Sequence, residues 1–175
     1  MMRMRWLGCL ALVCYAIHVG FHLYHGRPAD ALWGCHVASL LIAAGAFSEH
    51  ATPAAIGVLW LCFGNPMWLL DVATGGELLP TSLFTHVGGF IVGILVLKRL
   101  GFPRQVWWKA TLAFLGLLGL TRLVTPRASN VNLAFAVASG WEHTFPSYPV
   151  YLLLMVSAGT VTFFTAELGL RKVLA

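Results

Sequence analysis

The hydrophobic positions of the chain fall into six runs that are long enough to cross a membrane. These runs cover residues 6–24, 32–47, 54–72, 82–97, 106–123 and 148–168. A transmembrane helix needs about 20 predominantly apolar residues, and about 17 are tolerated. The runs 32–47 and 82–97 are at the short end, so their boundaries are the least defined. The pattern predicts an all-α bundle of six transmembrane helices, which forms one integral membrane domain over residues 1–175.

The segment 125–149 is the longest connection between these runs. It contains NVNLAFAVAS, which predicts a short helix that re-enters the membrane between the fifth and sixth helices. The sequence WEHTFPSYP follows it and is typical of an aromatic loop at the interface. Irregular backbone at membrane depth survives only where protein or a wet cavity satisfies its polar groups. We therefore expect this segment to line or cover a cavity.

The composition agrees with a membrane protein. Of the 175 residues, 59% are hydrophobic and 10% are charged, which excludes an ordinary soluble domain, where roughly 25% are charged. Six spans place both termini on one side, together with eight basic residues, whereas three lie on the other side. The side with eight holds Arg3, Arg5, Lys98, Arg99, Arg104, Lys109, Arg171 and Lys172, and the side with three holds Arg27, Arg122 and Arg127.

This distribution predicts cytoplasmic termini, in the inner membrane of a bacterium. The net charge of +5 therefore indicates topology and contact with anionic lipid heads. No aromatic and basic soluble surface accompanies it, so the sequence does not favour a nucleic-acid partner. The basic start and the apolar run to Tyr24, without a small-residue cleavage site, predict a first helix that is retained.

Three histidines lie in the stretch HVGFHLYH of the first run. His18, His22 and His25 point within about 60° of one another on a helix and form one polar stripe. His18 and His25 are roughly 10 Å apart along the axis, so the three cannot share one ion with bonds of about 2.1 Å. His18 and His22 could do so with His36 or His86 from a neighbouring helix. Otherwise the stripe bonds to neighbouring helices or lines a substrate cavity.

The fourth run begins with PTSLFTHVGGFIVG, residues 80–93. Gly89 and Gly93 form a GxxxG pattern, which permits close approach of another helix and offers a face for a homo-oligomer. His86 lies one turn before Gly89 on the same packed side. A histidine held there is a candidate general base, and its alternative role is a hydrogen bond between helices.

The second run begins with ALWGCHVAS, which places Cys35 beside His36. A cysteine with a histidine partner is a candidate nucleophile. Adjacent residues on a helix do not face each other, so Cys35 requires a histidine from another helix, and His86 is the natural candidate. Asp71, at the end of the third run, would orient that histidine. The sequence thus suggests a catalytic set of Cys35, His86 and Asp71, with His36 as a further candidate.

Other polar residues within or near the runs are candidates for contact with substrate. In FGNPMW, Pro66 removes a backbone hydrogen bond, and a kink there would expose the amide of Asn65. Because polar groups in a membrane face other helices or a cavity, we expect the whole set to face inward. The substrate-binding candidates are His18, His22, Asn65, Thr85, Arg122, Asn130 and Asn132.

Several short motifs occur in a recognisable order. They are FHL at 21–23, GCHVAS at 34–39, PTSLFTHVGG at 80–89, and NVNLAFA at 130–136 followed by FPSYPVYLL at 145–153. Together they make the chain resemble the family of small polytopic membrane proteins that includes transmembrane protein 164 and the bacterial YwaF-like proteins. The chain is more distantly similar to the androgen-induced gene 1 proteins. The resemblance covers most of the chain.

The resemblance implies a six-helix intramembrane enzyme that acts on lipid acyl esters through a Cys or Thr nucleophile and a later histidine. His86 matches the later histidine, and Cys35 lies at the position of the nucleophile. The family has His before Cys there, whereas this chain has Cys before His, so the equivalent residue is either Cys35 or His36. Asn130 and Asn132 match a pair of asparagines that lines the pocket in the family.

Our leading interpretation of the sequence is therefore a lipid hydrolase or acyltransferase with membrane lipids as partners. The Cys35 thiolate would attack an acyl carbonyl, His86 would act as base and then acid, and Asn132 or Arg122 would stabilise the oxyanion. This reaction needs no cofactor and no metal. Two alternatives stay open: a six-helix protein that binds or transports a small molecule, and a redox protein with a histidine-ligated metal or haem.

Overall fold

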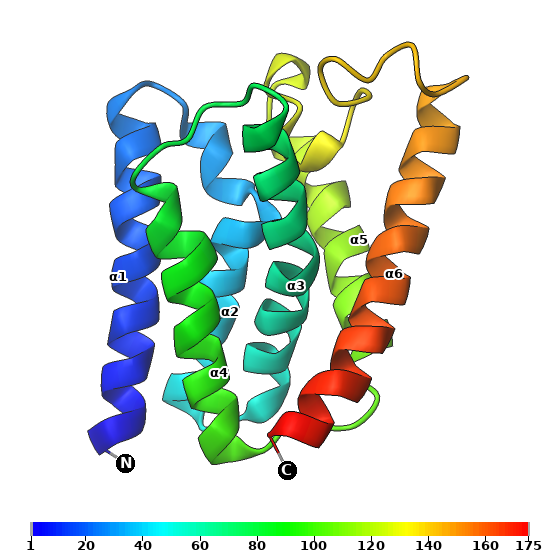
Figure 1. Ribbon diagram of the computed structural model, residues 1–175. Helices are drawn as coiled ribbons and strands as arrows, with labels where there is room; N and C mark the ends of the chain where they lie inside the picture. The colour runs from blue at the N-terminus through cyan, green and yellow to red at the C-terminus, as the bar shows by residue number, and fades with distance from the viewer. Residues whose placement is uncertain (1, 175) are drawn as a thin grey trace.

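The computed structural model describes residues 2–174, and the long elements within them are all α-helices. The helices run alternately up and down, so both ends of the chain lie at the same end of the bundle (Figure 1). The predicted all-α class is confirmed, while residues 1 and 175 of the predicted domain lie outside the described part. The helices are α1 (Met2–Tyr24), α2 (Gly34–Ser48), α3 (Ala51–Ala73), α4 (Gly89–Leu100), α5 (Trp107–Val124) and α6 (Tyr148–Val173).

Three of the described helices are long and apolar enough to cross a membrane. These candidate spans are Met4–Tyr24, Ala51–Ala73 and Tyr148–Val173. The helix α2 is apolar but has 15 residues, which gives about 22 Å at 1.5 Å per residue, against a hydrocarbon core of about 30 Å. The fourth predicted run is divided, because a π-helix, η2 (Phe84–Gly88), precedes α4.

The helix α2 lies at the centre of the bundle and packs against α1, α3 and α4. Its small residues let α3 approach closely: a Cβ added at Gly57 would come within 2.5 Å of the Ala38 carbonyl oxygen. Ala38 and Ile42 lie at this contact, and Ala43 and Ala46 are also buried in the core. Small side chains at a helix interface permit backbone contact, and here they make a dense core around α2.

The GxxxG face of α4 is used inside the chain. A Cβ at Gly89 would come within 2.8 Å of Ser39 Oγ, and one at Gly93 would overlap Val58 and Ile42. Both glycines are buried against α2 and α3. The predicted close approach of another helix is correct, but the face is not free for the homo-oligomer that the pattern suggested, because neighbouring helices of the same chain already cover it.

The helices α5 and α6 are joined by a buried carboxylate near the end of the bundle that holds the termini. Glu167 on α6 accepts backbone hydrogen bonds from Gln105, Val106 and Trp107, at 2.6, 2.8 and 2.9 Å. These N–H groups belong to the start of α5, where a helix has unpaired donors and a partial positive charge. Glu167 thereby satisfies the start of α5 and fixes its position against α6.

The connection between α5 and α6 lies at the opposite end of the bundle (Figure 1). The short helix predicted over NVNLAFAVAS is not formed. These residues contain one 3₁₀ turn, η4 (Val131–Leu133), and a second 3₁₀ turn, η3 (Arg127–Ser129), precedes them. Asn130 and Asn132 both have positive φ, of 42° and 56°, which breaks a continuous helix. The side chain of Asn132 binds the start of α2: its Oδ1 accepts from Gly34 N at 2.7 Å, and its Nδ2 donates to the Leu32 carbonyl at 2.8 Å.

Candidate metal centre

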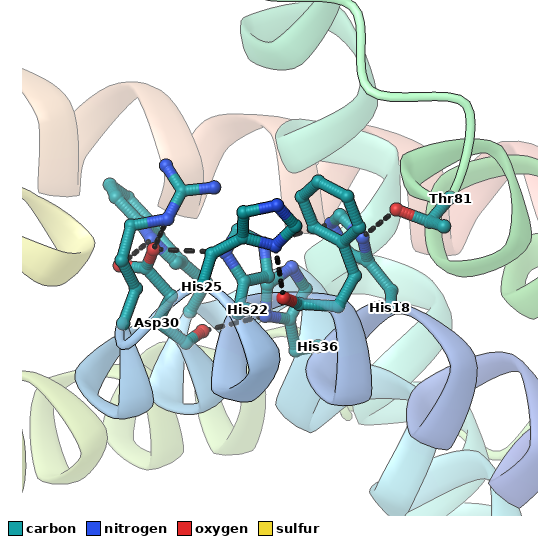
Figure 2. A network of polar contacts seen from close by, with 9 residues as sticks. His18, His22, His25, Asp30, His36 and Thr81 are labelled. Carbon is teal, nitrogen blue, oxygen red and sulfur yellow. Dashed lines mark hydrogen bonds and ion pairs between the residues drawn. The ribbon is translucent and has the colours of Figure 1, made fainter.

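Three buried histidines from two helices come together near the end of the bundle that faces away from the termini. His18 and His22 lie one turn apart on α1, and His36 lies near the start of α2 (Figure 2). The ring centroids of His18 are 4.6 Å from those of both His22 and His36, and the other two are 5.4 Å apart. One nitrogen from each ring lies within 4.8 Å of the others. We call these three side chains the histidine centre.

The spacing of the nitrogens suits a metal ion. Two ligands that are each about 2.1 Å from a tetrahedral metal lie roughly 3.4 Å apart. His18 Nε2 and His22 Nε2 are 3.4 Å apart. Without an ion, the same two atoms can share one hydrogen bond, which is the structural alternative for this pair. The third ring, that of His36, favours metal binding over this hydrogen bond, because a hydrogen bond between His18 and His22 needs no third imidazole.

The outer nitrogens of the three rings are held by oxygen atoms. His36 Nδ1 donates to the backbone carbonyl of Asp30 at 2.6 Å, and His18 Nδ1 contacts Thr81 Oγ1 at 2.9 Å. His22 Nδ1 lies 3.0 Å from Asp30 Oδ2, an ion-pair distance at an angle outside that of a hydrogen bond. A carbonyl oxygen only accepts, so the His36 proton is on Nδ1 and Nε2 keeps its lone pair. Ligand histidines in metal sites are oriented in this way.

Asp30 is held in place by a short turn. The segment η1 (Pro28–Leu32) begins with a proline, whose fixed φ favours a helical first turn. The indole nitrogen of Trp33 donates to Asp30 Oδ1 at 3.3 Å, and Arg27 Nε lies 3.6 Å from Oδ2. One residue therefore supports two ligand candidates, His36 through its carbonyl and His22 through its carboxylate.

The histidine centre is shielded from solvent but lies close to a pocket. The exposed fractions of His18, His22 and His36 are 3%, 6% and 3%. A pocket of about 730 Å³ opens between residues 26–32 and 124–129, and Asp30 forms part of its wall. A group that enters this pocket therefore contacts Asp30, the residue that supports His22 and His36. Buried imidazoles with free nitrogens next to a pocket can bind a divalent cation and leave a coordination position for water or substrate.

The structure brings together two histidines of the predicted stripe and separates the third. His25 is exposed, and its Nδ1 donates to the Phe21 carbonyl of its own helix at 2.8 Å, so it does not join the centre. His36 completes the pair that His18 and His22 were expected to form. Our leading interpretation needed no metal, whereas this geometry favours the alternative in which these histidines hold one.

His86 has a different environment. Its Nδ1 donates to Asn65 Oδ1 at 2.9 Å, while Asn65 Nδ2 donates to the His86 carbonyl at 3.1 Å. The ring also stacks on Trp68, with centroids 4.5 Å apart and an interplanar angle of 9°. His86 is close enough to His18 and His36 to interact with them electrostatically, but it is not a member of the three-nitrogen cluster.

The predicted Cys35, His86 and Asp71 set is not assembled in the described structure. Cys35 Cβ faces Gly64 on α3, whereas His36, next to it in sequence, faces α1, because neighbouring residues on a helix point about 100° apart. Asp71 is exposed at the end of α3, where its carboxylate lies over Gly76. The partner that orients His86 is Asn65, not Asp71.

The remaining substrate-binding candidates serve mainly the fold. Asn132 uses its amide in the bonds to α2 and in a third bond, to Thr121 Oγ1 at 3.0 Å. Asn130 accepts from the backbone of Phe135 and Ala136 within its own loop. Thr85 is fully buried, and its hydroxyl has no hydrogen-bond partner. Arg122 lies at the surface and is considered below.

Sequence reasoning missed Asp30 and Thr81 as partners of the histidines. Thr81 lies within the PTSLFTHVGG motif, which gave no sign that it contacts a histidine. Asp30 had a signal, since it is the one acidic residue among the first 48 and lies in a turn between two histidine-bearing runs. A carboxylate at such a position is typical of the groups that orient ligand histidines.

Comparison with known proteins adds no assignment. No protein-family model matches the chain, and neither does any curated protein or solved structure. The case for a function therefore depends on the residues of the histidine centre and on the chemistry that they permit.

Proposed function

We propose that the protein is an integral membrane metal-dependent hydrolase that cleaves an acyl ester of a membrane lipid at the histidine centre. The observation that carries this proposal is the arrangement of His18, His22 and His36, whose ring nitrogens converge while their outer nitrogens are held by oxygen atoms. Three imidazoles around an open position form a typical catalytic zinc site. The reaction class agrees with the family resemblance, but the reacting groups differ from the expected thiol.

The proposed topology places this centre near the outer face of the membrane. All six helices span the inner membrane of a bacterium, with both termini in the cytoplasm. The three long apolar helices and the eight basic residues on the side of the termini support this orientation. The segment 125–147 covers the outer end of the bundle in place of the re-entrant helix. A lipid then reaches the centre from the outer leaflet.

The chemistry follows from the residues of the site. A zinc ion lowers the pKa of its bound water to about 7 and polarises a carbonyl. His18, His22 and His36 hold the ion, and Asp30 and Thr81 keep their rings in position. The oxygen of the water bonds to the acyl carbon, the ester C–O bond breaks, and the proton passes to the departing alcohol. The products are a fatty acid and a lipid alcohol.

The metal content of the purified protein tests the first half of this proposal. We expect one zinc per chain by elemental mass spectrometry after dialysis, with content near zero in His36→Ala. His143→Ala is the matched control, because His143 is exposed and lies outside the centre. A wild-type protein that takes up no zinc, or equal zinc in wild type and His36→Ala, would overturn the assignment.

A turnover assay tests the second half. Zinc-loaded protein should release fatty acid from a dispersed lipid ester, and metal-stripped protein should do so only after zinc is returned. A protein that binds or transports small molecules would bind the lipid and release it unchanged. Labelling of Cys35 by an acyl electrophile that depends on His86 and not on zinc would restore the thiol mechanism and remove the metal from catalysis.

A further inference from the structure

Two arginines line a second pocket, separate from the histidine centre. The pocket measures about 480 Å³ and is formed by Arg122 on α5, Arg127 in η3, Ala134, Phe135 and Tyr148. It lies at the end of the bundle away from the termini, where the segment 125–147 connects α5 to α6 (Figure 1). Its two cationic groups and two aromatic rings differ from the predominantly apolar surface of the helices.

Neither arginine has an acidic partner. Among residues 2–174, the ion pairs made by acidic side chains are those of Asp30 with His22 and with Arg27, apart from any made by Arg99. Arg27 is thus neutralised, whereas Arg122 and Arg127 are not. Basic residues are depleted on the side of a membrane protein away from the cytoplasm. Two uncompensated arginines that share one pocket there are consistent with an anionic ligand.

The guanidinium of Arg122 is positioned before any ligand arrives. Its Nε donates to the Ala134 carbonyl at 2.7 Å, and one terminal nitrogen donates to Tyr148 Oη at 2.9 Å. The Tyr148 hydroxyl in turn contacts the Ala134 carbonyl at 2.5 Å. Arginine has five N–H donors in a fixed fork, so these two bonds leave the other donors for a ligand. A fixed guanidinium loses little conformational freedom on binding a phosphate.

The second cation is held by an aromatic ring. The guanidinium carbon of Arg127 lies 5.9 Å from the ring centroid of Phe135, as that of Arg122 lies 5.6 Å from the ring of Tyr148. Phe135 belongs to the segment that joins the last two helices, and Tyr148 is the first residue of α6. Aromatic side chains at helix ends are typical of the level of lipid headgroups. The pocket is therefore at the depth where a headgroup phosphate would lie.

The surface next to the pocket is apolar and exposed. Leu123 and Val124, directly after Arg122, are 85% and 59% exposed. Inorganic phosphate has no apolar part that would contact this surface, whereas the acyl chain of a lipid would pack against it. We propose that Arg122 and Arg127 bind the headgroup phosphate of an anionic membrane lipid, with its acyl chain along the outer surface of α5. This site is independent of the metal centre.

Short-chain lipids test this assignment on the full-length protein in detergent. Dihexanoyl phosphatidylglycerol, dihexanoyl phosphatidylcholine and inorganic phosphate are titrated separately by calorimetry. We expect phosphatidylglycerol to bind most tightly, and its affinity to fall at least about tenfold in Arg127→Gln, because a charged hydrogen-bonded contact is lost. Arg104→Gln is the matched control, since Arg104 is exposed in the loop between α4 and α5.

Two further variants make the result decisive. Arg127→Lys keeps the charge but loses the planar fork, so its affinity should lie between those of wild type and Arg127→Gln. His36→Ala should bind phosphatidylglycerol as the wild type does, which separates this site from the metal centre. Arg122→Gln also loses its bond to Ala134, so Arg127 carries the test if that variant does not fold.

Four results would overturn the assignment. Equal affinity for inorganic phosphate and phosphatidylglycerol would make this a site for free anions. Equal affinity for phosphatidylcholine would remove the preference for a net anionic lipid. Unchanged affinity in Arg127→Gln, or an equal loss in Arg104→Gln, would show that the arginine pocket is not where the lipid binds.

Discussion

The histidine centre and the His86–Asn65 pair both contain a histidine whose Nδ1 bonds to an oxygen atom, but several imidazoles converge only at the histidine centre. In His36 and in His86, Nδ1 donates to an oxygen, which leaves Nε2 with its lone pair. At the centre, one nitrogen from each of three rings lies within 4.8 Å of the others. At His86, the ring is covered on one face by Trp68, and its Nε2 belongs to no such group in the described structure.

In the proposed function, the convergence of three histidines, rather than their number in the sequence, makes the metal site. His25 is on the same helix as His18 and His22, yet it bonds to its own backbone and is exposed. His86 is buried and oriented by Asn65, but it does not belong to the cluster of three histidines. A single oriented imidazole can donate or accept a proton, whereas three converging imidazoles can coordinate a metal cation. The predictions below test this separation.

The largest effect is expected from removal of one ligand at the centre. His22→Ala should weaken zinc binding by more than about 100-fold, because loss of a ligand costs more than the 10–100-fold typical of supporting groups. His86→Ala should change the affinity by less than about threefold on the same argument, since it contributes no ligand. Competition with a zinc-chelating dye measures both. Equal losses in the two variants would mean that His86 belongs to the metal site.

A smaller effect is expected from the group that supports two of the rings. Asp30→Asn keeps the backbone carbonyl that accepts from His36, but removes the negative charge beside His22 and Arg27. Zinc affinity should fall by about 10–100-fold. Asp71→Asn is the control, because Asp71 is an exposed acid on α3. An Asp30→Asn protein with wild-type affinity would show that the carboxylate does not support the metal.

The fold was predictable where it depends on hydrophobic periodicity. Six apolar runs became six helices, and the GxxxG pattern marked a close approach. Which helix fills that contact depends on the packing of the whole chain, so Gly89 and Gly93 were assigned to a partner although α2 and α3 cover them. The π-helix at Phe84–Gly88 has no periodic signal, although it sets the direction of Thr85 and His86.

The site was predictable only in part, because its members come from different segments. Helical spacing placed His18, His22 and His25 on one stripe and excluded a single ion shared by all three, and His36 was one of two possible additions to the pair His18 and His22. The orientation of Cys35 could not be read from its neighbour, since that depends on which side of α2 faces α1. Asp30 and Asn132 act through loops, where backbone geometry decides which polar groups meet.

The His86–Asn65 pair should affect stability without affecting the metal. Asn65→Ala leaves the buried Nδ1 of His86 without its acceptor, which should reduce the free energy of unfolding by about 1–3 kcal/mol. Zinc affinity should stay within about twofold of the wild type, since no group that orients the ligands has changed. Denaturant unfolding in detergent and dye competition measure the two quantities. A large loss of zinc affinity would show that the His86–Asn65 pair is part of the metal site.

The smallest effect is expected next to His86. Thr85 is fully buried and its hydroxyl has no hydrogen-bond partner, so Thr85→Val should leave stability unchanged or raise it by up to about 1 kcal/mol. Thr121→Val is the matched control, because the buried Thr121 hydroxyl donates to the Leu117 carbonyl and accepts from Asn132, and its loss should destabilise the protein by about 1 kcal/mol. Equal destabilisation in the two variants, measured by denaturant unfolding, would mean that the Thr85 hydroxyl is hydrogen-bonded. A buried water beside His86 would then be its partner.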